Sequence, residues 1–261
     1  MKTIVCIKHV PDTETKIRVG ADGRSIDESQ VNKWIISPYD EYALEQALLF
    51  RESQDGEVVI VSAGRQAAQA TLRQGLAMGA DRGVLVQDDR LDGGDGLTRA
   101  RALAAICRAE SPDLVLTGKY GVGSDEAQTA PMLAELLGWP HAAGVSRLEL
   151  AEGGFEVTRA IEGAVEVQQG RLPAVISCEK GLNEPRYPSL KGIMQAKKKP
   201  IEVKSAADAG LDEELLGAGP QLVWEALELP PERGAGRLIE GSGDEAGREL
   251  VRILHEEAKV I

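Results

Sequence analysis

Short runs of β-branched and aliphatic residues alternate with longer amphipathic segments along the first half of the chain. The runs show no strict alternation of apolar and polar residues, as expected of strands buried on both faces, and they lie at 3–10, 56–64, 82–87 and 113–118. Helical spacing of apolar residues predicts helices that begin near Pro38 and that cover about 66–78 and 95–109. This order predicts an α/β fold whose sheet is mostly parallel, with right-handed crossovers.

Two helix starts carry local capping signals. Ser37 offers a capping hydroxyl, and Pro38 follows at the first helical position, ahead of carboxylates in the first turn. Asp125 and Gln128 have the spacing of a capping box, so the next helix is expected to begin at Asp125. The free N–H groups and the dipole of that helix N-terminus favour a phosphate.

The pattern changes after Pro140. Alternating β-rich stretches predict antiparallel additions to the sheet and lie at 144–150, 155–160 and 164–168. Residues 172–178 then return to a buried strand. Near the N-terminus, residues 16–35 predict a small hairpin that turns at Ala21-Asp22-Gly23.

The last part of the chain, residues 206–261, has the composition of an acidic arm. It carries thirteen acidic and five basic side chains and several glycines, with little core pattern. A helix over about 244–258, capped by Ser242 and Glu245, is expected near its end. We therefore expect an α/β domain over 1–205 followed by this arm.

Composition excludes several classes of protein. With 261 residues and 43% hydrophobic content, the chain can bury a full core. The net charge of -12 and the 3% aromatic content argue against a nucleic-acid or anionic membrane partner for the whole surface. Three widely spaced cysteines support neither a disulfide framework nor a zinc site. Without a signal segment or an apolar run long enough to span a membrane, a cytoplasmic, bacterial-type protein is expected.

One segment is basic within this acidic chain. From 178 to 200 there are six Lys or Arg against two Asp or Glu, and three prolines exclude a long helix. Its apolar tips are Leu190, Ile193 and Met194. An ordered loop of this kind favours docking, because less entropy is lost on binding. A solvated connector is the alternative.

Ligands of open parallel sheets bind beyond the carboxyl ends of the strands, where the strand order reverses. Four loops of this sequence qualify, and they lie at 6–12, 37–40, 62–65 and 118–129. The last combines glycines, Lys119 and a helix start, which suits a nucleotide phosphate but matches neither a P-loop nor a dinucleotide fingerprint. A plain connection remains the alternative.

Catalytic and metal-binding constellations are not apparent. Histidines 9, 141 and 255 lie in unrelated segments, so neither a triad nor a metal cluster can be argued. Cys6 lies inside a predicted strand, where an inert buried thiol is expected. We expect no catalytic residue and no metal site.

The segment Leu182-Asn183-Glu184-Pro185-Arg186-Tyr187, with Leu190 and Lys197-Lys198-Lys199, resembles the signature of electron transfer flavoprotein β subunits. Further likeness extends over nearly the whole chain. The other matching segments are Lys8 to Asp12, Ser37 to Glu41, Ala77 to Arg82, Gly118-Lys119, Gln128-Thr129 and Gly138-Trp139-Pro140.

This resemblance implies an electron carrier without catalytic residues of its own, with a three-layer, Rossmann-like fold of the adenine nucleotide α-hydrolase type. It implies a heterodimer with an α subunit, one FAD at the subunit junction, and a structural AMP in this chain. Electrons would come from acyl-CoA dehydrogenases or related flavoenzymes and pass to a membrane-bound quinone oxidoreductase. Leu190 would insert into the dehydrogenase, within a docking set of Arg186, Tyr187, Leu190, Ile193, Met194, Lys197, Lys198 and Lys199.

The resemblance also implies a nucleotide site built from the four loops. Its residues would be Cys6, Ser37, Pro38, Tyr39, Asp40, Ala63, Gly118, Lys119, Tyr120, Gly121, Val122, Gly123, Ser124, Asp125, Glu126, Ala127, Gln128 and Thr129. Electron-bifurcating relatives hold a second FAD there and accept electrons from NADH, and Asp125-Glu126-Ala127-Gln128 is similar to their loop. Ala160 stands where relatives carry an acidic residue that helps to hold the flavin domain of α, which implies a different or a looser hold.

Two other classes remain open from the residues alone. A nucleotide-binding regulatory module without a redox role would need the same strand-end loops, and so would an ATP-using α/β enzyme. Copurification with an α-like partner and a flavin separates both from an electron carrier.

Overall fold

The computed structural model describes residues 1–92, 94–211, 213, 216, 219–231 and 234–261. The chain divides into two compact units, Met1–Leu227 and Glu228–Ile261, which are described separately. Residues 206–227, assigned above to the arm, belong to the first unit. Arm residues 212, 214–215, 217–218 and 232–233 lie outside the described residues.

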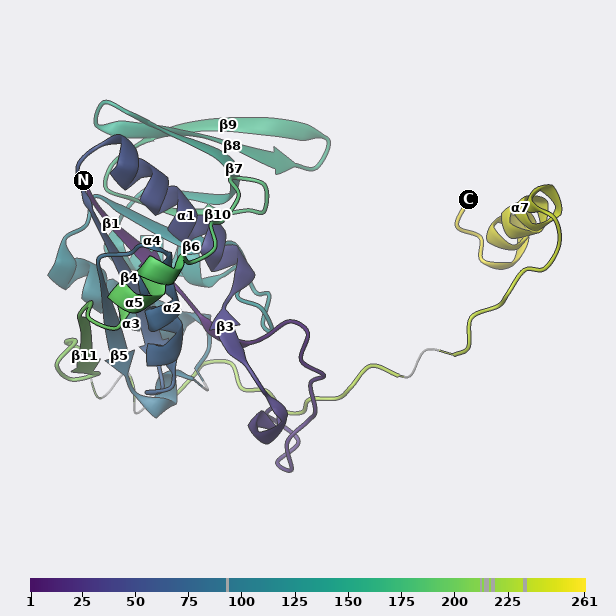
Figure 1. Ribbon diagram of the computed structural model, residues 1–261, viewed down its shortest axis with the longest axis horizontal. Helices are drawn as coiled ribbons and strands as arrows, with labels where there is room; N and C mark the ends of the chain where they lie inside the picture. The colour runs from purple at the N-terminus through teal and green to yellow at the C-terminus, as the bar shows by residue number, and fades with distance from the viewer. Residues whose placement is uncertain (93, 212, 214–215, 217–218, 232–233) are drawn as a thin grey trace. The chain divides into compact units, whose positions relative to one another are not determined.

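A nine-stranded sheet forms the centre of the first unit (Figure 1). Its strands, in spatial order, are β11 (Ile201–Ser205), β5 (Arg82–Gln87), β4 (Glu57–Gly64), β1 (Lys2–Cys6), β6 (Leu114–Gly118), β10 (Ala174–Cys178), β7 (His141–Ala151), β8 (Gly154–Ile161) and β9 (Ala164–Arg171). All pairs from β11 to β7 are parallel, and β7, β8 and β9 are antiparallel neighbours. The predicted parallel sheet with antiparallel additions is confirmed.

Helices cover both faces of the sheet, which makes three layers. The helices α1 (Pro38–Ser53), α2 (Ala68–Met78) and the short α5 (Leu190–Ala196) pack on one core, with strand residues such as Val5 and Leu116. The helices α3 (Gly96–Glu110) and α4 (Thr129–Leu137) pack on the other, with residues such as Ile4 and Val115. Because central strands bury side chains on both faces, their sequences lack alternation. The predicted Rossmann-like, three-layer α/β fold is confirmed.

The N-terminal run differs from the prediction of one strand over 3–10. The chain leaves the main sheet after Cys6 and forms β2 (His9–Pro11), which pairs antiparallel with β3 (Trp34–Ile36). Proline at the end of β2 cannot donate to a ladder, which suits a two-stranded edge. The predicted hairpin over 16–35 is reduced to one antiparallel bridge, Val19 to Ile26, followed by a 3-10 turn at Glu28–Gln30.

Helix α1 begins at Pro38 as predicted, but the expected hydroxyl cap is wrong. The Ser37 side chain makes no capping bond to the helix; its Oγ accepts from Val122 N at 3.3 Å and lies 3.4 Å from the Tyr120 carbonyl oxygen. Ser37 therefore ties the start of α1 to the loop after β6. The carboxylate of Asp40 in the first helical turn also bonds outside the helix.

The second unit contains helix α7 (Gly243–Arg252), which continues as a π-helical turn, η3, over Ile253–Glu257. Glu245 accepts from the Ser242 N–H at 3.0 Å, as the predicted capping box requires. Neither α7 nor the turn buries a residue within the described chain. Among the described helices, none is long and apolar enough to cross a membrane.

Candidate nucleotide site

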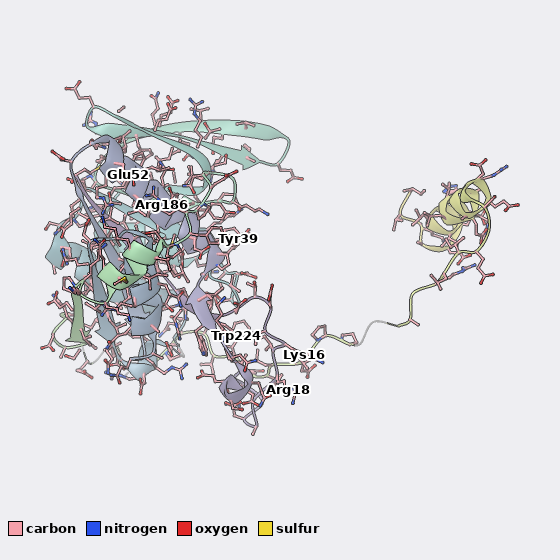
Figure 2. All side chains as sticks on the ribbon, in the orientation of Figure 1. Lys16, Arg18, Tyr39, Glu52, Arg186 and Trp224 are labelled. Carbon is pink, nitrogen blue, oxygen red and sulfur yellow. The ribbon has the colours of Figure 1, made fainter. Side chains whose placement is uncertain are left out.

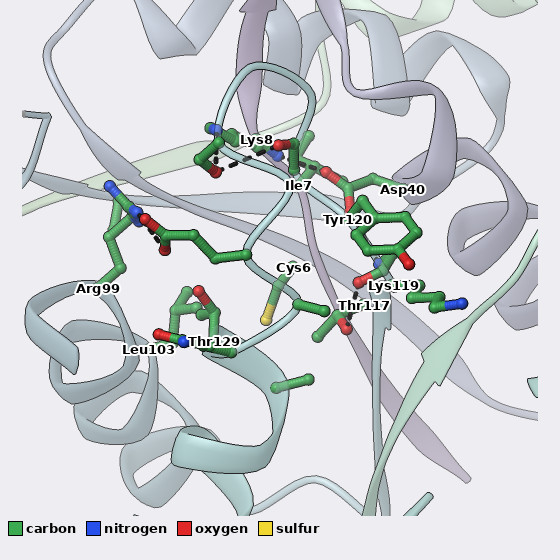
Figure 3. A pocket seen from close by; sticks show the side chains of 18 residues that line it. Cys6, Ile7, Lys8, Asp40, Arg99, Leu103, Thr117, Lys119, Tyr120 and Thr129 are labelled. Carbon is green, nitrogen blue, oxygen red and sulfur yellow. Dashed lines mark hydrogen bonds and ion pairs between the residues drawn. The ribbon is translucent and has the colours of Figure 1, made fainter. Parts of the chain in front are cut away.

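Strand order reverses between β1 and β6 at the centre of the sheet. From β1 the chain passes to β4 and β5 on one side of β1. It then crosses to β6 on the other side of β1, and β10 lies next to β6 in the sheet. A cavity of ≈ 690 Å³, part of it open to solvent, lies at the carboxyl ends of these central strands (Figure 3). Its position is the one expected for a ligand of an open parallel sheet.

Most of the predicted site residues line this one cavity. Those that do are Cys6, Asp40, Ala63, Gly118, Lys119, Tyr120, Gly121, Ser124, Glu126, Ala127, Gln128 and Thr129. The predicted residues outside the lining are Ser37, Pro38, Tyr39, Val122, Gly123 and Asp125. Segments far apart in sequence meet here because parallel strands bring their carboxyl ends to one edge.

Six lining residues were not among the predicted site residues: Ile7, Lys8, Arg99, Leu103, Thr117 and Ala130. Lys8 lies in the strand-end loop 6–12 that the sequence selects, a signal that could have found it. Arg99 and Leu103 are one helical turn apart in α3, on a face that the sequence does not distinguish from any other amphipathic helix. Only the packing of α3 beside the loop after β6 brings them to the cavity.

Asp40 connects three of the segments that form the cavity. Its carboxylate oxygens accept from Lys8 N at 2.7 Å and from Gly118 N at 2.8 Å, at the ends of β1 and β6. Burial raises the pKa of Asp40 to about 7, and the two backbone hydrogen bonds work against that rise. Asp40 thus holds the two strand ends at a fixed separation.

Gly118 leaves the space that this arrangement needs. A Cβ at Gly118 would come within 2.6 Å of Asp40 Oδ1 and 2.7 Å of the Tyr39 backbone. Any side chain there would push α1 away from β6 or break the bond from Gly118 N to Asp40. A glycine is therefore required where the helix start meets the strand end.

Two cations face the cavity from different elements. Lys8 Nζ donates to Val122 O at 3.1 Å and to Ser124 Oγ at 3.2 Å, and burial together with the nearby Arg99 charge lowers the pKa of Lys8. Arg99 reaches from α3 and lies 3.6 Å from a Glu126 carboxylate oxygen. Figure 3 shows Lys8 and Arg99 at the same side of the cavity. Half-buried positive charge of this kind attracts an anionic ligand group.

The loop from Gly118 to Thr129 has an unusual backbone. Asp125 and Ala127 adopt positive φ values of 47° and 53°, a region that costs a residue with a Cβ about 1 kcal/mol or more. Helix α4 begins at Thr129, and Gln128 is its N-cap without a side-chain bond. The prediction that this helix begins at Asp125 with a capping box is wrong, because the left-handed residues keep the chain out of the helix.

An aromatic and ionic cluster borders the outer side of the cavity. Tyr39 and Tyr120 pack edge to face with ring centres 5.2 Å apart. Lys119 Nζ lies 4.8 Å from the Tyr120 ring centre and 2.6 Å from a Glu179 carboxylate oxygen. Lys119 is thereby committed to protein partners, which leaves Lys8 and Arg99 as the cations that face the interior.

Cys6 is buried at the cavity wall, and desolvation raises its thiol pKa well above the ordinary value. The protonated thiol is a poor nucleophile, so the expected inert role fits. Within the described residues, no group of three or more His, Cys, Asp or Glu side chains could hold a metal ion.

The basic segment 178–200 is fastened to the helices beneath it. Arg186 bonds Glu45 at 2.8 Å and Glu52 at 2.5 Å, both on α1 (Figure 2). Lys199 Nζ donates to the carbonyl oxygens of Leu76 and Gly79 at the end of α2, at 3.2 and 3.1 Å. Of the predicted docking residues, these two cations serve the internal structure.

The apolar tips of the segment point to solvent. The exposed fractions are 96% for Tyr187, 84% for Leu190, 71% for Met194 and 46% for Ile193. Lys197 and Lys198 are exposed as well. Ser189 caps α5 by accepting from Gly192 N at 3.0 Å, so Leu190 is the first residue of an ordered helix. These apolar side chains form an ordered, exposed patch on the same segment as the exposed lysines.

Comparison with known proteins agrees with the resemblance. The family model described as "Electron transfer flavoprotein domain" matches residues 26–209. "Electron transfer flavoprotein subunit beta" of Bacillus subtilis is 41% identical over 262 residues, covering 100% of both chains. The protein of the same name from Bradyrhizobium diazoefficiens is 43% identical over 213 residues, 81% of this chain and 84% of its own. That of Bos taurus is 38% identical and covers 94% of each chain.

Proposed function

Because the chain belongs to the electron transfer flavoprotein family as a β subunit, we propose that it binds a structural AMP in the cavity between β1, β6 and α3. The β subunit is an electron carrier subunit whose partner is an α subunit. The observation that carries the AMP proposal is the pair of half-buried cations, Lys8 and Arg99, facing a cavity at the reversal of strand order.

The residues present fit an adenine nucleotide. The cavity wall combines apolar side chains such as Ile7 and Leu103, which suit a base, with the cations and hydroxyl groups that suit a phosphate. Thr129 begins α4 at the same edge, where free N–H groups add to the positive field. Lys8, Arg99, Ser124 and Thr129 would hold the phosphate.

We further propose that one FAD lies at the junction with the α subunit and supplies the redox chemistry of the heterodimer. Electrons would be received from an acyl-CoA dehydrogenase or a related flavoprotein and passed to a quinone oxidoreductase. The exposed patch of Tyr187, Leu190 and Met194 on an ordered segment supports docking to the dehydrogenase.

A second candidate is an electron-bifurcating or NADH-linked carrier that holds a second FAD in place of AMP. The order Asp125-Glu126-Ala127-Gln128 favours it, because Ala127 offers no polar side chain where AMP-binding relatives carry one. A larger ligand would extend through the open side of the cavity.

Coexpression of this chain with its α subunit tests these proposals. The expected product is a yellow heterodimer that an acyl-CoA dehydrogenase reduces. Nucleotides released by denaturation, identified by mass spectrometry, should be AMP and one FAD per heterodimer. Two FAD and no AMP would select the second candidate. A colourless chain that fails to bind α would overturn the carrier function.

A further inference from the structure

Arg99 and Glu126 form a contact across the cavity wall that the predicted nucleotide site did not include. Arg99 lies on α3, Glu126 in the loop after β6, and their side chains are 19% and 21% exposed. Their closest N to O distance is 3.6 Å, longer than a hydrogen bond, so the attraction is ionic without a directional bond. Arg99 Nη1 also donates to the Gly94 carbonyl oxygen, so the contact with Glu126 is the weaker of these two contacts of Arg99.

Lys8 adds a second positive charge without an equivalent carboxylate. Its side-chain contacts are two neutral oxygens, Val122 O and Ser124 Oγ, and the Arg99 charge helps lower its pKa. Asp40, Glu126 and Asp125 act in the opposite sense at longer range. Two cations thus face one cavity. Asp40 and Glu126 are the carboxylates among its lining residues, and Glu126 is the one that pairs with Arg99.

The backbone on both sides of Glu126 is strained. Asp125 and Ala127 have φ values of 47° and 53°, so the loop holds Glu126 between two left-handed residues that carry a Cβ. The carboxylate lies against the first turn of α3, since a Cβ at Gly96 would be in ordinary contact with Glu126 Oε2, at 3.4 Å. The loop therefore directs Glu126 toward α3 at a conformational cost.

We propose that Arg99 is a phosphate-binding, specificity-determining residue of the cavity and that Glu126 is an internal anion that the phosphate replaces. On binding, the guanidinium exchanges a distant carboxylate for direct bonds to phosphate oxygens, while Lys8 supplies the second positive charge. The inference rests on the proposed nucleotide function. The chemical class that it requires is a nucleoside phosphate, because a nucleoside alone offers the two cations no phosphate oxygens.

The test compares AMP with adenosine on the nucleotide-free heterodimer by calorimetry. Wild type should bind AMP more tightly, and Arg99→Gln should reduce the ratio of AMP to adenosine affinity roughly ten- to hundredfold, with adenosine affinity unchanged. Arg101→Gln, two residues along α3 and not among the lining residues, is the matched control and should leave the ratio unchanged. Glu126→Gln should raise AMP affinity roughly two- to fivefold, because it removes the competing carboxylate.

The possible results distinguish a failure of this inference from a failure of the proposed function. Wild type that binds neither AMP nor adenosine would contradict the nucleotide site itself. Wild type that binds AMP, with an unaltered ratio in Arg99→Gln or an equal loss in Arg101→Gln, would overturn the role of Arg99. Lower AMP affinity in Glu126→Gln would overturn the exchange, and this variant decides the question if Arg99→Gln does not fold.

Discussion

Asp40 is the residue on which the backbone geometry of the cavity depends. Its buried carboxylate accepts the N–H groups of Lys8 and Gly118, yet desolvation raises its pKa from 3.8 to about 7. A carboxyl whose pKa is higher in the folded than in the unfolded state binds more protons when folded. Stability from this group is therefore present at low pH and is lost as pH rises through the folded pKa.

This loss of stability on ionisation leads to a prediction for Asp40→Asn, whose side chain has the shape of aspartate but cannot ionise. Between pH 4 and pH 8, wild type should lose up to about 4 kcal/mol of unfolding free energy relative to the variant. Urea denaturation of both proteins at several pH values measures the difference. A difference that does not change with pH would show that Asp40 titrates normally.

At the same scale, the position of a residue in the chain decides whether its place in the site can be predicted from the sequence. Cys6, Asp40 and the loop from Gly118 to Thr129 follow strands or begin a helix, so their approach to one edge follows from parallel topology. Arg99 has no such signal. It is one arginine among several on α3, and its role depends on how that helix rotates against the sheet, which side-chain packing decides.

At the scale of elements, Arg186 secures the basic segment 178–200 to α1. Glu45 is only 5% exposed and depends on Arg186 for compensation, whereas Glu52 is 47% exposed. Arg186→Ala should cost about 1 to 3 kcal/mol, less than for a fully buried pair, because Arg186 itself is one-third exposed. Chemical denaturation measures this cost, and hydrogen exchange should increase over residues 183–190.

Glu52→Ala is the matched control for this prediction. It removes the exposed half of the pair and should cost less than about 1 kcal/mol. Equal losses in the two variants would mean that the buried Glu45 contact contributes nothing beyond a surface ion pair.

Helix α5 is the element through which the basic segment 178–200 would contact its partner. Leu190→Ala removes the side chain that is 84% exposed at the first helical position and should leave the flavin spectrum and the fold unchanged. Reduction by the dehydrogenase should slow at least tenfold, as expected for truncation of a central apolar anchor (roughly 2 kcal/mol). Stopped-flow reduction kinetics measure this rate.

Gln195→Ala, on the same short helix and also exposed, should leave the kinetics unchanged. Loss of rate in Gln195→Ala as large as in Leu190→Ala would point to a general perturbation of the helix. Wild-type kinetics in Leu190→Ala would contradict the docking role.

Elements with strong periodicity were predicted from the sequence, whereas strand β11 and the start of α4 were not. Strand β11, at Ile201–Ser205, follows a lysine run and has exposed residues, so it lacks the apolar run of a buried strand. Its position beside β5 depends on Lys199 and Arg73, whose hydrogen bonds attach the chain just before β11 to helix α2. The start of α4 was misplaced because Asp125 fits a capping box locally, while the strained loop over the cavity places Asp125 and Ala127 in left-handed conformations.

At the scale of the whole molecule, residues 206–227 are held within the first unit by hydrogen bonds. Asp95 caps α3 through Thr98 and also accepts from the N–H groups of Gln221 and Leu222, at 2.7 and 3.1 Å. Leu227 N donates to Gly23 O at 2.8 Å. The end of the first unit is therefore held by bonds that do not involve the second.

Large apolar side chains are exposed in the second unit, residues 228–261. The exposed ones are Leu229, Leu238, Leu250, Val251, Val260 and Ile261. We predict that this unit packs on the α subunit, where these side chains would be buried. Truncation after Leu227 should then preserve the sheet and the cavity but weaken association with α by at least about tenfold, or roughly 1.4 kcal/mol.

Sedimentation or titration of the truncated chain with α measures that association, and AMP affinity of the truncated chain reports on the cavity. Leu250→Asp combined with Val251→Asp in the full-length chain should reproduce the weaker association, because both side chains are exposed on α7. Full association of the truncated chain would mean that α binds the first unit alone. Loss of AMP binding on truncation would mean instead that residues beyond Leu227 stabilise the cavity, in conflict with the bonds at Asp95 and Gly23 that secure the first unit by itself.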